Sequence, residues 1–202
     1  MTTDGPKRTT ANRPGCLVGF SIFWIAFSLV FLFVGLGDDS WVFAIFGGIF
    51  VAIGFGLLVY AVMGLITRYR MGKPIVTFSL PTLHVGDSFT MTYEHTLRQS
   101  LNVQSFTVDL IFREVATYQQ GTDTRTVTHN HIIDSFEQPS GHYHSGHFWH
   151  ETFEMTIPAD GMHSLDVRRN KLKWIAKIQI KIPKLPDFVE EYELTVLPEM
   201  AR

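Results

Sequence analysis

The order of apolar and polar residues divides this chain into two unlike parts. Near the N-terminus, residues 16–36 and 42–66 form two runs that contain no charged residue. At a rise of about 1.5 Å per residue, a helix of either length crosses the roughly 30 Å hydrocarbon core of a bilayer. A buried helix of a soluble protein is rarely apolar on all sides for that length. The pattern therefore predicts two transmembrane helices.

Basic residues flank the two runs on their outer sides, and the short segment between the runs has none. They are Lys7, Arg8 and Arg13 before the first run, and Arg68, Arg70 and Lys73 after the second. Cytoplasmic flanks of membrane helices are enriched in Lys and Arg. We therefore expect a two-helix transmembrane hairpin over residues 16–67 in the plasma (inner) membrane. Residues 1–15 are expected to be a disordered cytoplasmic N-terminus, and the chain from residue 74 onward is expected to be cytoplasmic.

The residue types within the two runs suggest an anchor rather than a transport path. Neither run contains an ionisable residue, although such residues are the usual mark of ion or proton pathways. The second run has glycines that admit close helix packing, and the first has a stripe of phenylalanines to receive them. These are Gly47, Gly48, Gly54, Gly56 and Gly64, and Phe20, Phe23, Phe27 and Phe31. A self-packed hairpin is the interpretation that we favour, and a binding site for a partner's helix is the alternative.

After residue 74 the apolar positions alternate with polar ones, as they do in half-buried strands. Residues 121–124 predict a tight turn, and residues 125–133 are expected to pair back on the preceding strand. The expected inward-facing sets are Phe89, Met91 and Tyr93; Phe106, Val108, Leu110 and Phe112; Trp149, Phe153, Met155 and Ile157; Trp174, Ala176, Ile178, Ile180 and Ile182; and Tyr192, Leu194 and Val196. About seven strands in such a segment predict an antiparallel β-sandwich over residues 74–198.

Three stretches of this segment carry a resemblance to a known fold: VDLIFREVATYQQGTDTRTVTH, FEMTIPADGMHSL and KWIAKIQIKIPKLPDFVEEYELTVL. They resemble the strands of an arrestin-like, immunoglobulin-like β-sandwich. With the two membrane runs ahead of it, the whole chain resembles an uncharacterised family of small bacterial membrane proteins of this plan. The resemblance covers most of residues 17–198. It implies a membrane anchor and an adaptor-type sandwich, and it supplies no catalytic or binding residues.

Six of the nine histidines fall between positions 129 and 150. Residues two apart in a strand share a face, so His129 and His131 form a possible ligand pair. A hairpin could bring them opposite His144 or His147, and these four histidines are the candidate ligands of a zinc-type site. By alternation we expect His147 to point toward the core and His150 toward solvent. A pH-responsive cluster and ordinary exposed histidines are the alternatives.

Other chemistry in the sequence is limited. The chain has no nucleophile elbow, phosphate-binding loop or dinucleotide fingerprint, so we expect no enzymatic activity and no cofactor. The formal net charge of −2 argues against nucleic-acid binding. One basic cluster, together with the residues that follow the second run, could contact anionic headgroups, although a solvated turn is the alternative. These candidate membrane contacts are Arg68, Arg70, Lys73, Arg168, Arg169 and Lys171.

Together these patterns predict a membrane-anchored, non-catalytic interaction or adaptor module that presents a β-sandwich at the cytoplasmic face. Its expected partners are the lipid bilayer and a protein, which could itself be embedded in the membrane. The alternative function is a histidine-dependent metal or pH sensor in the membrane.

Overall fold

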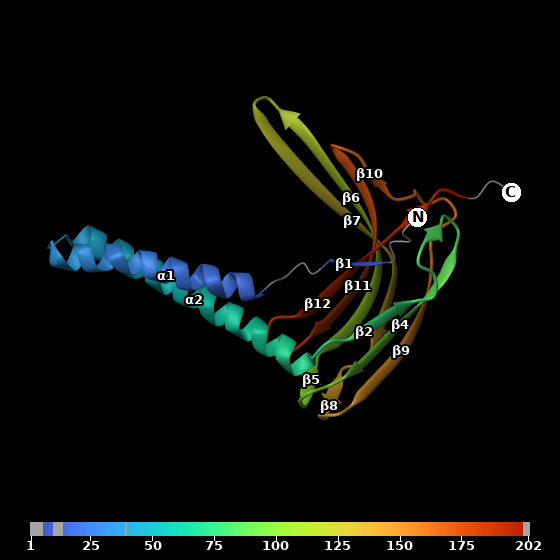
Figure 1. The fold of residues 1–202 in the computed structure, drawn as a ribbon, viewed down its shortest axis with the longest axis horizontal. Coiled ribbons are helices and arrows are strands. Elements are labelled where there is room, and N and C mark those ends of the chain that lie inside the picture. The colour runs from blue at the N-terminus through green and yellow to red at the C-terminus, as the bar shows by residue number, and fades with distance from the viewer. Residues whose placement is uncertain (1–5, 10–13, 39, 200–202) are drawn as a thin grey trace. The chain divides into compact units, whose positions relative to one another are not determined.

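The structure, a computed structural model, describes residues 6–9, 14–38 and 40–199. These residues form two compact units, one built from helices and the other from strands (Figure 1). The strand unit takes residues from both ends of the chain, because it includes the segment before the first helix as well as almost everything after the second. Two helices followed by an all-β domain of mostly antiparallel sheets agree with the predicted fold class.

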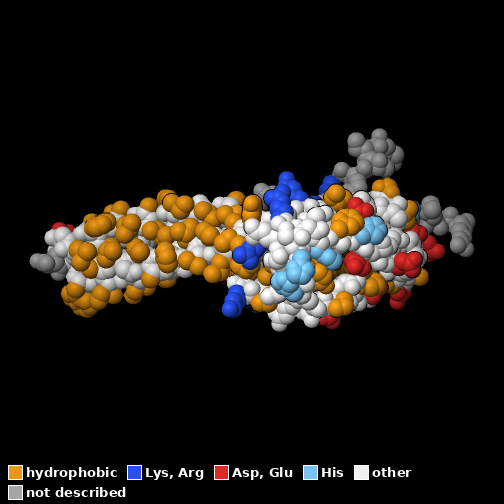
Figure 2. Space-filling view, turned by 90° about the horizontal axis from the view of Figure 1, so that it is seen from below, with side chains coloured by type: hydrophobic (Ala, Val, Ile, Leu, Met, Phe, Trp, Pro, Cys, Tyr) orange, Lys and Arg blue, Asp and Glu red, His pale blue; other side chains and the backbone are white. Residues whose placement is uncertain are grey.

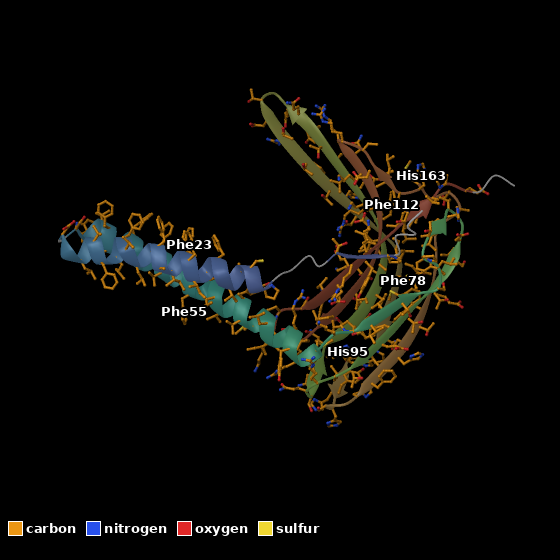
Figure 3. The ribbon with its side chains drawn as sticks, in the orientation of Figure 1. Phe23, Phe55, Phe78, His95, Phe112 and His163 are labelled. Carbon is orange, nitrogen blue, oxygen red and sulfur yellow. The ribbon has the colours of Figure 1, made fainter. Side chains whose placement is uncertain are left out.

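The helical unit contains α1 (Pro14–Gly37), α2 (Trp41–Met71) as far as Tyr69, and residues 184–187. Both helices are long and apolar enough to cross a membrane, by length and composition. Hydrophobic side chains cover the surface of this unit (Figure 2). Phe33 is 67% exposed and Phe55 is 61% exposed, and Phe23 also projects outward (Figure 3). The two helices therefore bury little of their apolar surface against each other.

The contact between the helices is made by small residues that recur every seven positions. In α1 the buried residues are Pro14, Ser21, Ser28 and Gly35, and in α2 they include Gly47, Gly54 and Ala61. A seven-residue period is typical of helices that wrap around each other with a left-handed twist, and small residues let their backbones approach closely. This set defines a small-residue seam that runs along the hairpin.

The seam leaves no room for larger side chains at its tightest points. A Cβ atom added to Gly47 would lie 2.5 Å from the backbone nitrogen of Leu32, and one added to Gly35 would lie 2.2 Å from that of Ala44. Close packing at Gly47 and Gly54 confirms part of the prediction. The phenylalanine stripe is wrong as the receiving surface, because Phe20, Phe23 and Phe27 are exposed. Gly47 instead meets Leu32, and Gly54 meets Trp24 and Ile25.

The β unit contains two main sheets. The larger sheet has the order β1-β12-β11-β6-β7, with β10 paired to β11, and the smaller sheet has the order β2-β4-β9. Two short pairs, β13-β3 and β5-β8, complete it. The bounds are β1 Lys7–Thr9, β2 Ile75–Phe78, β3 Leu83–His84, β4 Ser88–Thr96, β5 Leu101–Val103, β6 Ser105–Gln120, β7 Asp123–Gln138, β8 Gly141–Tyr143, β9 Phe148–Thr156, β10 Leu165–Asp166, β11 Asn170–Lys181, β12 Phe188–Leu194 and β13 Val196–Leu197.

Aromatic residues from the two main sheets pack against each other and form the core. The ring of Phe106 in β6 lies 5.2 Å from that of Tyr93 in β4 and 6.3 Å from that of Phe153 in β9. Every residue of the predicted inward-facing sets is buried. The structure therefore confirms a β-sandwich whose alternating positions face inward as the sequence predicts.

The longest strands, β6 and β7, form a hairpin that extends past the rest of the larger sheet (Figure 1). Gly121 begins the two-residue loop with φ = +66°, a conformation that glycine adopts without steric strain. The predicted turn and return strand are confirmed, and the return strand runs on to Gln138. A register shift between Leu110 and Ile111 marks a β-bulge, which increases the local twist.

The N-terminal segment differs from the prediction of disorder over residues 1–15. Lys7–Thr9 form β1, which pairs antiparallel with β12 so that Arg8 lies opposite Tyr192. Pro14 already belongs to α1, whereas residues 1–5 and 10–13 lie outside the described residues. The reason is a long-range ion pair between Arg8 and Glu190, which no local pattern indicates.

Candidate functional site

The histidines between positions 129 and 150 gather in separate places in the β unit. His129 and His131 lie side by side in β7, with ring centroids 4.4 Å apart, which confirms that they share a face. The Nε2 atom of His131 is 3.9 Å from Oε1 of Glu114 in β6. His142 and His144 form a second pair, with ring centroids 4.9 Å apart, at β8 and the turn that follows it.

These pairs do not converge into a metal centre. Among the described residues, no group of three or more His, Cys, Asp or Glu side chains is arranged to hold a metal ion. The expected inward position of His147 is wrong: its residue is exposed, because β9 begins at Phe148 and His147 still belongs to the turn closed by its hydrogen bond to the His144 carbonyl. His150 is exposed, as predicted, and its Nδ1 atom lies 3.2 Å from Oε1 of Glu94.

The candidate membrane-contact residues occupy different parts of the fold. Arg68 belongs to the helical unit and the others to the β unit. Arg168 and Arg169 form the tight turn between β10 and β11, which two backbone hydrogen bonds between Val167 and Asn170 close. Lys171 is engaged with Asp166 at 2.8 Å. Arg168, Arg169 and Lys171 therefore lie together at one hairpin turn, where Lys171 is already paired.

Lys73 lines a pocket of about 220 Å³ in the β unit, which we call the His95 pocket. Its walls come from the segment after α2, from the end of β4 and from the start of β9. They are Gly72, Lys73, Ile75, Glu94, His95, Thr96, Arg98 and Phe148. Gly72 has φ = +83°, and a Cβ atom added there would lie 3.3 Å from Nε of Arg98. Glycine thus lets the chain turn directly after the helix with the Arg98 side chain lying against it.

His95 is the unusual member of this pocket. It is 2% exposed, and its ring lies 5.9 Å from the rings of both Tyr93 and Trp149. Neither ring nitrogen makes a hydrogen bond of ordinary geometry with the described residues. Burial lowers the pKa of His95, and a weaker hydrogen-bonding interaction with the backbone of Met71 acts in the opposite direction. Both ring nitrogens are shielded from solvent, so the His95 imidazole forms part of the packed inner wall of the pocket.

A second buried polar cluster lies where β1 joins the larger sheet. Glu190 is 1% exposed, and its carboxylate accepts hydrogen bonds from the Arg8 guanidinium and, at 2.8 Å, from the Tyr192 hydroxyl. Burial and the negative charge of Glu190 together raise the pKa values of Tyr93 and Tyr192. This cluster ties the N-terminal segment to the sandwich, and we assign it a structural role.

Sequence analysis missed both His95 and Glu190 as special positions. His95 continues the inward phase of Phe89, Met91 and Tyr93, so alternation alone places a polar ring in the core. Glu190 likewise shares the inward face of β12 with Phe188 and Tyr192. A polar residue in phase with an inward-facing apolar set is the signal that could have identified them.

Comparisons with known proteins leave the family open. No protein-family model and no curated protein matches the chain. Among solved structures, the sporulation control protein Spo0M from Bacillus subtilis is similar at 12% identity, with a TM-score of 0.48 over 62% of this chain and 49% of Spo0M. The chain therefore spans about half the length of that protein. No residue of the present chain takes a function from this likeness.

Proposed function

We propose that the chain is a membrane-anchored, non-catalytic interaction module. Its helical hairpin holds an arrestin-like β-sandwich at the cytoplasmic face of the plasma (inner) membrane, where a protein partner binds the sandwich. The observation that carries the proposal is a pair of apolar, uncovered helices that lie in the chain between two strands, β1 and β12, paired in one sheet. We do not carry forward the histidine-dependent sensor, because the histidines that it needs lie in separate pairs.

The exposure of the helices supports membrane anchoring. A core helix of a soluble protein is mostly buried, whereas the most apolar windows of α1 and α2 are 11% buried. A signal sequence would lie near the N-terminus, and α2 begins only at Trp41. Large contiguous apolar surfaces that remain exposed in a protein mark sites of contact with a partner or a membrane. For two helices of this length, a bilayer is the medium that satisfies their whole circumference.

The pairing of β1 with β12 supports a hairpin topology. β1 precedes α1 and β12 follows α2, yet Lys7 pairs with Glu193 and Thr9 with Glu191 in the same sheet. Strands of one sheet lie on one side of a membrane, so the chain must cross an even number of times between them. The basic residues on both flanks favour the cytoplasm for that side.

The free edge of β7 is the surface that we assign to the protein partner. β7 is sixteen residues long and ends the order of the larger sheet, so one side of its backbone is unpaired within the described sheet. Residues 126–133 carry no Lys, Arg, Asp or Glu, and all are exposed. Natural edge strands are usually protected by short length or by charge. β9, the corresponding edge of the smaller sheet, has Glu151 and Glu154 and fits that rule.

An unprotected edge of this length suits the addition of an extended strand from a partner, in which main-chain hydrogen bonds supply affinity. The test is site-specific photocrosslinking in native membranes, with a photoreactive amino acid at Thr128 in β7 or at Thr152 in β9. Both threonines are exposed on edge strands, so the second position is a matched control. We expect one defined protein to be captured from Thr128 and not from Thr152.

Two results would contradict this assignment. Capture of the same protein with equal efficiency from both threonines would indicate nonspecific proximity. Capture from a photoreactive residue at Phe55 in α2, with none from Thr128, would place recognition in the helical hairpin instead.

A further inference from the structure

We propose that the His95 pocket binds the phosphate group of an anionic phospholipid from the cytoplasmic leaflet. The inference rests on the proposed function, because membrane anchoring brings the pocket to the bilayer. It adds a ligand, a site and named contact residues, which the anchoring proposal does not contain.

The position of the pocket along the chain supports a lipid ligand. The apolar run ends at Ile66, and α2 continues for five more residues to Met71 before the pocket begins at Gly72. Five residues of helix extend about 8 Å, and each headgroup layer of a bilayer is roughly 5–8 Å thick. Chain connectivity therefore holds Gly72 and Lys73 near headgroup depth, and a tilt of the helix would bring them closer still.

The polar lining of the pocket suits a phosphate. Lys73 and Arg98 are both exposed, and ammonium and guanidinium groups form strong charge-assisted hydrogen bonds with phosphate oxygens. Glu94 also lines the pocket, but its carboxylate lies 3.2 Å from Nδ1 of His150. With the histidines neutral, the lining carries one net positive charge. His95 closes the inner wall of the pocket with a buried imidazole.

The apolar lining favours a lipid over a soluble phosphate. Ile75 is 60% exposed and Phe148 is 57% exposed, and both line the pocket beside its basic groups. A free phosphate ion gains nothing from such side chains. The glycerol and upper acyl carbons of a phospholipid would cover them while its phosphate contacts the basic groups.

The turn at Arg168 and Arg169 offers an internal comparison. It presents two exposed basic residues in a tight hairpin turn, outside the residues that line the His95 pocket. General attraction to an anionic surface would use this turn as well as Lys73. A built site would depend on Lys73 and would not depend on the turn.

The test places the chain in nanodiscs of two compositions, phosphatidylcholine alone and phosphatidylcholine with phosphatidylglycerol. The protein is then released with a mild detergent, and native mass spectrometry identifies the lipids that it retains. We expect selective retention of phosphatidylglycerol by the wild-type chain. Lys73→Ala should weaken that retention about fivefold, since one basic residue near an anionic surface contributes about 1 kcal/mol. The double variant Arg168→Ala/Arg169→Ala should retain the lipid as the wild type does.

Several results would overturn the inference. These are equal retention of the two lipids, retention by Lys73→Ala that equals the wild type, or loss of retention in the Arg168→Ala/Arg169→Ala control. Inorganic phosphate distinguishes the source of the ligand. Displacement of bound phosphatidylglycerol from the mixed nanodiscs, or a rise in melting temperature in nanodiscs of phosphatidylcholine alone, would assign the pocket to a soluble phosphate. Extraction of native membranes with alkaline carbonate separates the two proposals, because release of the chain would contradict anchoring itself, and retention without lipid selectivity would contradict the inference alone.

Discussion

Arg8 in β1 and Glu190 in β12 form an ion pair across 182 positions of sequence, with both apolar helices between them in the chain. Glu190 is buried, and the Arg8 side chain is partly exposed. The pair fixes the segment before α1 to the sheet that follows α2. The chain before α1 and the chain after α2 therefore enter the same β unit, and the topology that we propose depends on this.

Removal of the Arg8 side chain should destabilise the β unit. A buried carboxylate that loses its charged partner costs about 1.5–3 kcal/mol, and the partial exposure of Arg8 favours the lower end of that range. We expect Arg8→Ala to lower the free energy of unfolding by this amount in detergent-solubilised protein, measured by denaturant unfolding.

A double-mutant cycle supplies the control for this pair. Glu190→Gln removes the negative charge that Arg8 compensates, so the double variant Arg8→Ala/Glu190→Gln should be more stable than the sum of the single effects predicts. Strict additivity of the two substitutions would show that the ion pair contributes nothing to the attachment of β1.

The small-residue seam predicts that alanine is tolerated at only one of two adjacent glycines. A Cβ atom at position 47 would overlap the backbone of Leu32, whereas one at Gly48 would meet no atom within 4 Å. Overpacking at a tight contact typically costs about 1–3 kcal/mol. Gly47→Ala should lower the thermal stability of the hairpin in detergent, and Gly48→Ala should leave it unchanged. If the two variants melt together, α1 and α2 do not meet along this seam.

Burial of His95 predicts a pH dependence of stability. Because burial lowers the pKa of His95 below its ordinary value of about 6.5, the unfolded chain binds this proton more readily than the folded chain does. The stabilising contribution of neutral His95 is thus complete above about pH 6.5 and declines as the pH falls from there toward the lowered pKa. His95→Phe should flatten the dependence of melting temperature on pH in this range.

The exposed His163 supplies a matched control for that experiment (Figure 3). Since His163 is exposed, the pH profile of His163→Phe should follow the wild type. A His95→Phe profile that coincides with the wild type would mean that other groups determine the acid sensitivity of the fold.

Local periodicity accounts for the parts of the fold that the sequence predicted well. Alternation in β4, β6, β9, β11 and β12 correctly identified the inward-facing residues, because a strand's side-chain period depends only on its own backbone. The same rule failed for His147, because alternation holds only inside a strand and β9 starts one residue later. The start of a strand depends on the preceding turn, which periodicity does not specify.

The features that the sequence did not reveal depend on contacts between distant segments. β1 has three polar residues and no apolar pattern, and its pairing depends on Glu190 far along the chain. In the hairpin, the predicted packing of glycines on a phenylalanine stripe did not include the seven-residue spacing of Ser21, Ser28 and Gly35. The His95 pocket likewise depends on distant segments, because its lining combines the turn after α2 with parts of β4 and β9.

The most direct test of the proposed membrane topology is cysteine accessibility in spheroplasts. Single cysteines are introduced at Thr9, Ser40 or Thr124 in a Cys16→Ser background and exposed to a membrane-impermeant maleimide. The account predicts that the cysteine at position 40 reacts in intact spheroplasts, whereas those at positions 9 and 124 react only after the membrane is permeabilised. Reaction of either position 9 or position 124 in intact spheroplasts would contradict a hairpin with both flanks in the cytoplasm.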